Sequence, residues 1–212
     1  MTHDRGEILV GLAERAIRAG LDLPVPVVDS SAGPQPEPAW LAEPGAAFVT
    51  LHVPGGGGRP RLRGCIGTIE PYRSLREDVQ GNARAAAFSD PRFPALTAPE
   101  LAHLDIEVSV LSPREPLPYA DRADLVAQLR PGVDGLVLEY GGRRGTYLPQ
   151  VWDQIPDPAD FLASLVTKAR LPQGFWSDDI VLWRYTVTAY PQPPAHPLPS
   201  PELGPGPAES TP

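Results

Sequence analysis

The only cysteine of the chain lies in a segment that is rich in arginine and glycine. Cys65 stands between Gly64 and Gly67 in RLRGCIGTIEPY, two residues after Arg63. A thiolate is a strong nucleophile, and nearby guanidinium groups favour the thiolate form. Free cysteine is also among the most frequently buried side chains, so the same residue is compatible with a place in the core. The surrounding pattern must decide between these two interpretations.

Strand alternation places the thiol among arginines. Because alternate side chains of a strand share a face, a regular strand directs Arg61, Arg63 and Cys65 to one side and the apolar residues between them to the other. A bulge at Gly64, or the opposite register, would instead bury the thiol. Glycine within a strand often marks a bulge or the close approach of a ligand or another backbone, which favours a site here.

A carboxylate on a later strand is the candidate partner of the thiol. In LDIEVSVL, the period of two puts Asp105, Glu107 and Ser109 opposite the apolar residues. Glu107 could act as a general base or form an ion pair with Arg63 across the sheet. The ion pair is the commoner role for a single carboxylate on a strand.

A second polar cluster lies between residues 134 and 150. Guanidinium, hydroxyl and amide groups there suit the recognition of a carboxylate or phosphate, because a guanidinium group binds such anions through two hydrogen bonds. Turn formation explains Asp134-Gly135 equally well. We predict that Cys65 and Glu107 are catalytic. The predicted substrate-binding residues are Arg63, Gly64, Gly67, Asp134, Arg144 and Gln150.

No metal or cofactor site is predicted. A single cysteine excludes multi-cysteine zinc and iron–sulfur sites within this chain, and the four histidines are scattered. The GGGG stretch at residues 55–58 lacks the lysine, the Ser or Thr and the following helix of a phosphate-binding loop. We interpret it as a flexible turn.

The composition indicates a folded domain, with 42% hydrophobic and 21% charged residues. The formal net charge of -8 argues against nucleic acid as a partner. The first 24 residues contain no long apolar run, so neither a signal peptide nor a membrane span is expected. Together with a single, presumed-reduced thiol, this predicts a cytoplasmic protein.

The order of predicted elements repeats. A helix at 5–20 is followed by a β-hairpin, a helix that starts at Ser74 in a capping box, and the strand LDIEVSVL. A hairpin from LVLEY to RRGTYLPQ, a helix begun by Asp157-Pro158 and the strand DIVLWRYTVTAY repeat this order, with a separate helix in ADRADLVAQLR between the copies. We therefore predict a duplication, with units at about 45–112 and 132–190 of a domain spanning 1–190. The proline-rich segments 24–44 and 191–212 are predicted to be a loop and a disordered tail.

Several motifs together resemble one family. They are RLRGCIGTIEP, AAAFSDPRFPALTAPEL, LDIEVSVLSP, QLRPGVDGLVLEYGGRRGTYLPQVW and WRYTVTAY. From about Glu7 to Tyr190 the chain resembles the AMMECR domain family, whose prokaryotic members are called AmmeMemoRadiSam system protein A. The family signature LRGCIG matches residues 62–67 without departure. The resemblance implies an α+β fold of two duplicated β-hairpin–α–β units with swapped strands, plus an N-terminal helix.

The resemblance implies partners, although it brings no established reaction. Family members often occur with a Memo-like protein and a radical SAM enzyme, which implies a shared pathway. The first hypothesis is a cysteine-dependent enzyme, or enzyme component, acting on a small anionic substrate, with Arg63 stabilising the thiolate of Cys65 and Glu107 exchanging protons. The alternative is a non-catalytic binding or adaptor module for an anionic ligand or for partner proteins.

Overall fold

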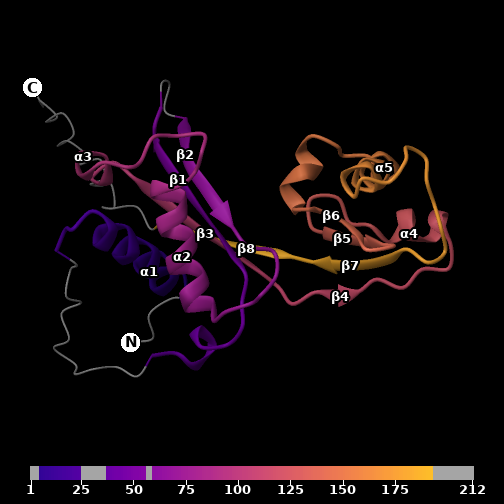
Figure 1. Ribbon diagram of the computed structural model, residues 1–212, viewed down its shortest axis with the longest axis horizontal. Coiled ribbons are helices and arrows are strands. Elements are labelled where there is room, and N and C mark those ends of the chain that lie inside the picture. Colours follow the sequence, from indigo (N-terminus) through magenta and orange to yellow (C-terminus); the bar gives the residue numbers. More distant parts are fainter. Residues whose placement is uncertain (1–4, 25–36, 56–58, 193–212) are drawn as a thin grey trace, which may run out of the picture.

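The computed structural model describes residues 5–24, 37–55 and 59–192. It consists of two lobes side by side, each an antiparallel four-stranded sheet with helices on one face (Figure 1). The middle of the predicted proline-rich loop, most of the GGGG turn and nearly all of the predicted tail lie outside the described residues.

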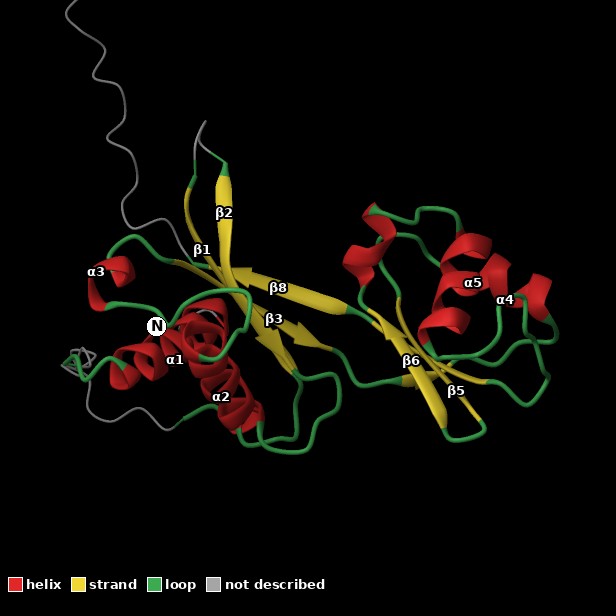
Figure 2. Ribbon diagram, turned by 45° about the horizontal axis from the view of Figure 1, so that its top comes forward, coloured by secondary structure: helices red, strands yellow, loops and turns green. Residues whose placement is uncertain are grey.

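The first lobe contains the sheet β2-β1-β3-β8. Its strands are β1 (Ala47–Pro54), β2 (Pro60–Gly67), β3 (Asp105–Leu111) and β8 (Val187–Pro191). The helices α1 (Arg5–Gly20) and α2 (Leu75–Phe88) lie together on one face of this sheet (Figure 2), and α3 (Ala98–Leu101) is a single turn. A 3-10 turn, η1 (Ala39–Leu41), precedes β1.

Local sequence explains the two long helices of the first lobe. The apolar stripe of α1, which includes Leu9, Leu12 and Ile17, is buried against the sheet. At the start of α2, the amide of Glu77 donates to the Ser74 hydroxyl at 3.3 Å, and the amide of Ser74 donates to the Glu77 carboxylate at 3.1 Å. The predicted capping box is therefore confirmed, and it satisfies two amides that the helix itself leaves without partners.

The second lobe contains the sheet β4-β7-β5-β6. Its strands are β4 (Glu115–Pro116), β5 (Gly135–Tyr140), β6 (Arg143–Tyr147) and β7 (Val181–Tyr185). The helices α4 (Arg122–Gln128) and α5 (Pro158–Lys168) cover one face, and α5 is capped by Asp157, as predicted. The 3-10 turn η3 (Pro149–Asp153) follows β6, so Gln150 lies on a helical turn rather than on the predicted hairpin strand.

The two lobes exchange strands. Each half of the chain supplies a hairpin, a helix and a third strand to its own sheet, and then one further strand to the other sheet: β4 pairs with β7, and β8 pairs with β3. The closing segment predicted as one strand is therefore two, β7 and β8, separated by Thr186. The predicted α+β fold with duplicated units and swapped strands is confirmed.

The strand register identifies equivalent positions in the two halves. Leu51 lies opposite Gly64 in the first hairpin, and Leu138 lies opposite Gly145 in the second. A Cβ atom on Gly64 would stand 2.2 Å from the carbonyl oxygen of Ala86 in α2, and one on Gly145 would stand 2.7 Å from the amide nitrogen of residue 169. In both halves, glycine lets the helix backbone approach the strand.

We predict that Gly64→Ala destabilises the protein by about 1–3 kcal/mol. The added methyl group would clash with the backbone of α2, which cannot move aside as a flexible side chain can. Gly11→Ala in α1 is the control, since its Cβ would meet only the flexible end of Arg15 at 3.1 Å. The control should be neutral or stabilising by up to about 1 kcal/mol. Urea unfolding measures both, and equal effects for the two variants would contradict this account of Gly64.

Candidate functional site

A cavity of about 370 Å³ lies where the open face of the first sheet meets the second lobe. The first sheet contributes residues of β1, β2, β3 and β8, and the second lobe contributes the segment around η3. The lining residues are Phe48, Thr50, His52, Cys65, Glu107, Ser109, Leu148, Gln150, Val151, Gln154 and Val187.

The strand register aligns the polar residues of this cavity in rows. Cys65 lies opposite Thr50, and Thr50 lies opposite Glu107, so the three side chains cross the sheet on the face away from the helices. The hydroxyl of Thr50 donates a hydrogen bond to the Cys65 sulfur at 3.4 Å. Ser109 lies two residues further along β3, and its hydroxyl donates to the Glu107 carboxylate at 3.3 Å. The structure thus brings both predicted catalytic residues to one cavity.

Arg63 does not share a face with Cys65, so that expectation is wrong. The pairing of β1 with β2 shifts between Leu51 and His52, which leaves Arg63 as an extra residue in a β-bulge. The extra residue reverses the alternation of side chains between the two sheet faces in the part of β2 that precedes Gly64. Arg63 therefore points toward the helices. There it is buried, 5% exposed, and forms hydrogen bonds of 2.8 and 3.2 Å with the Glu100 carboxylate. The expected cross-strand ion pair with Glu107 is therefore not formed.

A different arginine lies beside Cys65. The Asp90 carboxylate accepts a hydrogen bond from the Cys65 amide at 2.9 Å and holds Arg92, which in turn donates to the Cys65 carbonyl oxygen at 3.1 Å. Hydrogen bonds from Arg92 hold the pKa of Asp90 well below its usual range. The pKa of Arg92 is raised, chiefly by Asp90 and to a lesser extent by the Cys65 thiol. The sequence signal for this pair was the Asp-Pro-Arg turn that follows α2.

Two further predicted binding positions, Asp134 and Arg144, have structural roles outside the cavity. Asp134 is fully buried and accepts hydrogen bonds from the backbone and side chain of Arg130 at 3.0 and 2.9 Å. Arg144 forms ion pairs with Glu70 and Glu139.

The glycine positions are closed by protein atoms. Gly64 lies under the α2 backbone, and a Cβ on Gly67 would stand 2.2 Å from the ring of Phe48. Of the predicted substrate-binding residues, Gln150 lines the cavity with Cys65 and Glu107.

Several lining residues were missed by sequence reasoning. Thr50 and His52 alternate with buried residues of β1, and that period of two was the available signal. Gln154 and the apolar wall of Leu148, Val151 and Val187 come from another lobe or from the far end of the chain, so no local pattern connects them with Cys65.

The second half of the chain has lost the equivalent of this site. Thr146, Val137 and Trp183 form the row that corresponds to Cys65, Thr50 and Glu107. Tyr185 fills the adjacent space: it is 2% exposed, and its hydroxyl donates to the Tyr147 carbonyl oxygen at 3.1 Å. Aromatic side chains therefore occupy the place where the first half has a polar cavity.

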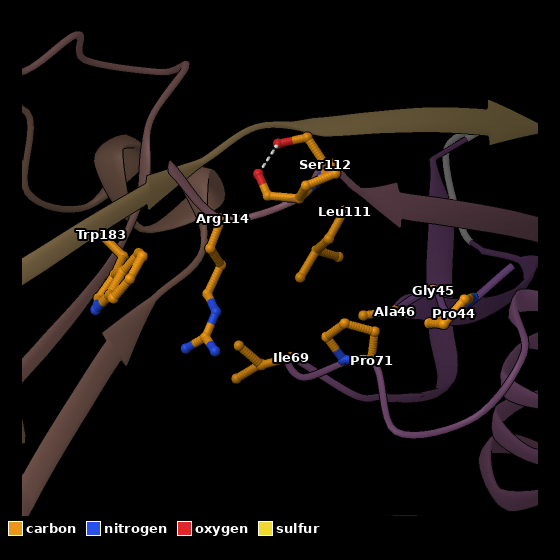
Figure 3. Close-up of a pocket in the computed structure, with 10 residues that line it drawn as sticks. Pro44, Gly45, Ala46, Ile69, Pro71, Leu111, Ser112, Arg114 and Trp183 are labelled. Atoms are coloured by element: carbon orange, nitrogen blue, oxygen red, sulfur yellow. Dashed lines mark hydrogen bonds between the residues drawn. The ribbon is translucent and has the colours of Figure 1, made fainter. Parts of the chain in front are cut away.

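A second cavity, of about 280 Å³, lies beside the strands that cross between the lobes (Figure 3). Among its polar groups, the indole nitrogen of Trp183 is buried and has no hydrogen-bond partner within the described residues. Arg114 lies 3.2 Å from the Glu70 carboxylate, and the Ser112 hydroxyl donates to the Pro113 carbonyl oxygen at 3.1 Å. Apolar walls that include Ile69 and Leu111 complete this cavity, and its described lining residues include neither a cysteine nor a carboxylate, which are the groups that make the cavity at Cys65 the stronger candidate.

Within residues 5–24, 37–55 and 59–192, no three His, Cys, Asp or Glu side chains are grouped so as to hold a metal ion. In the same part of the chain, no helix has the length and apolar character needed to cross a membrane.

The fold and the cavity define a duplicated α+β protein with exchanged strands and a single cysteine site in its first half. A sequence model described as AMMECR1 matches residues 10–190. A protein of Thermofilum pendens is 38% identical over 182 residues, which cover 83% of this chain and 84% of that protein. A protein of Methanothermobacter thermautotrophicus is 37% identical over 198 residues, 90% of this chain and 95% of that one. The chain belongs to the AMMECR1 family.

A solved structure agrees with this assignment. The crystal structure of uncharacterized protein PH0010 from Pyrococcus horikoshii is similar with a TM-score of 0.67 and 35% identity, over 87% of this chain and 89% of that one. The names of these relatives state no activity, so a function must be argued from the site.

We predict that Glu100→Gln reduces the loss of stability in acid. The hydrogen bonds from Arg63 lower the pKa of Glu100 from 4.5 to about 2. The folded state therefore prefers the ionised carboxylate, and this contribution is complete above the unfolded-state pKa and is lost as the pH falls from 4.5 toward 2. Urea unfolding near neutral pH and at about pH 3 should show a smaller difference for the variant than for the unmodified protein.

The matched control is Glu115→Gln, which removes an equal charge from a side chain that is 73% exposed. It should leave the acid dependence unchanged. The same acid loss in Glu100→Gln as in the unmodified protein would contradict the assigned role of the Arg63–Glu100 pair.

Proposed function

We propose that this protein is a thiol-dependent enzyme, or the substrate-binding component of one, and that the cavity at Cys65 holds a small-molecule substrate. The observation that carries the proposal is the convergence of Cys65, Glu107 and Gln150 on this cavity from distant parts of the sequence. The volume of about 370 Å³ falls within the range of small-molecule sites, and the mixture of apolar walls and a few polar groups is typical of them.

The proposed role of Cys65 is to attack an electrophilic carbon of the substrate. The Thr50 hydroxyl donates a hydrogen bond to the sulfur and so helps to fix its position on the cavity wall. Glu107 lies on the same row and His52 on the same face, and either can exchange a proton with the substrate. The amide of Gln150 would orient the bound molecule from the other lobe.

An anionic substrate was expected from the sequence because Arg63 and Arg144 were predicted to bind it. Both arginines lie away from the cavity. Arg63 is paired with Glu100, and Arg144 is paired with Glu70 and Glu139. Neither is among the described residues that line the cavity. We therefore propose a small substrate that need not be anionic.

The second candidate function is a binding module without catalysis. It is favoured by the amides of Gln150 and Gln154, which face the cavity beside an apolar wall and can hold a ligand by hydrogen bonds alone. A Memo-like protein and a radical SAM enzyme are the proposed pathway partners. Co-purification of the tagged chain with each protein expressed beside it tests direct binding.

We predict that iodoacetamide alkylates the folded protein once, at Cys65, because the thiol is partly exposed and lines the cavity. Intact-mass measurement over time gives the rate, and a rate within about tenfold of that of a free thiol is expected. Cys65→Ser is the control and should gain no mass. Labelling that occurs only after unfolding would make Cys65 a packing residue and would favour the binding module.

A second measurement addresses the chemistry. The folded protein is incubated with a small-molecule extract of cells and its intact mass is measured for a covalent adduct. An adduct on the unmodified protein that is absent from Cys65→Ser supports the enzyme. Binding of the same compound without any adduct, and with equal strength in both proteins, supports the binding module.

A further inference from the structure

The charge balance of the cavity differs from that of the rest of the first lobe. Elsewhere in this lobe, buried or partly buried carboxylates have arginine partners: Asp78 with Arg73, Asp90 with Arg92 and Glu100 with Arg63. Among the described residues, Glu107 forms no such ion pair. Its carboxylate accepts a hydrogen bond from Ser109 at 3.3 Å, which leaves further acceptor positions on its two oxygens.

A carboxylate on a cavity wall attracts a cation that enters the cavity, because opposite charges interact more strongly where little water separates them. Glu107 is partly buried and lines the cavity. A positively charged group that enters the cavity would therefore give Glu107 the cationic partner that the described residues do not provide.

The other charged groups near the cavity do not offset Glu107. Asp105 lies opposite His52 at the end of the same sheet face and adds negative charge. Arg92, the nearest arginine identified beside Cys65, is held by the Asp90 carboxylate at 2.7 Å, so that this pair is neutral overall. The protein as a whole carries a formal net charge of -8, which also attracts cations.

We infer that the cavity recognises a small molecule with a protonated amine, for which Glu107 is the counter-ion. This inference rests on the proposed function and specifies its substrate class. The apolar wall of Phe48, Leu148 and Val187 would contact the body of the molecule, and the thiol of Cys65 lies on the same row as Glu107. The arrangement thus places an amine and an electrophilic carbon of one ligand within reach of different side chains.

The single thiol allows a direct test with three reagents of different charge. They are 2-aminoethyl methanethiosulfonate, which is cationic, methyl methanethiosulfonate, which is neutral, and 2-sulfonatoethyl methanethiosulfonate, which is anionic. In each case the Cys65 sulfur attacks the sulfenyl sulfur, a disulfide forms, methanesulfinate leaves and the thiol proton passes to solvent. Rates are measured by intact mass and divided by the rates for 2-mercaptoethanol, which removes the intrinsic reactivity of each reagent.

The expected result is a cation-to-anion rate ratio of roughly ten or more for the unmodified protein, since the two reagents experience opposite interactions with the Glu107 carboxylate, which lines the same cavity as the thiol. Glu107→Gln should bring the ratio close to one. Glu115→Gln removes the same charge from β4, outside the cavity, and should keep the ratio high. Circular dichroism checks that both variants are folded, and the ratio for the unmodified protein tests the inference without any variant.

Equal rates, or a faster anionic reagent, would overturn the inference while leaving the thiol reactive and the proposed function intact. A cation preference that survives in Glu107→Gln would assign it to the overall charge of the protein and would overturn the inference too. If no reagent labels the folded protein, the proposed function fails together with its substrate class.

Discussion

The exchange of strands between the two sheets is the constraint on which the rest of this structure depends. The chain passes from one sheet to the other twice, at Ser112 and at Thr186, and the two passages are hydrogen-bonded to each other. The Ser112 amide donates to the Thr186 carbonyl oxygen at 2.9 Å, and the Thr186 amide donates to the Ser112 hydroxyl at 3.0 Å. Because each sheet contains a strand from the other half, neither half can complete its sheet alone.

The cavity follows from this exchange. The open face of the first sheet carries Cys65 and Glu107, and the crossing strands bring the η3 turn of the second lobe over that face (Figure 1). A small apolar cluster at the junction, which contains Val137 and Tyr185, fixes the contact between the lobes. The cavity is therefore a product of the interface between two similar units, and only the first unit supplies Cys65 and Glu107.

Equivalent positions in the two halves are under different structural constraints. Gly64 and Gly145 keep the same role, because helix and strand must approach closely in both units. The neighbouring positions Cys65 and Thr146 have no such shared constraint, since they lie on the face away from the helices. In the second unit that face is filled by aromatic side chains and contributes to the junction, whereas in the first it remains hollow.

The sequence alone predicted most of the elements, their repetition and the cysteine strand as a candidate site, because these predictions depend on local periodicity, caps and turns. Whether Arg63 or another arginine lies beside Cys65 was decided by a bulge, and a bulge depends on how two strands pair rather than on one strand's alternation. The roles of Arg92, His52 and Gln154 were also decided only by the tertiary structure. No local pattern connects these residues with Cys65. Packing and strand exchange bring His52 and Gln154 to its cavity and Arg92 to its carbonyl oxygen.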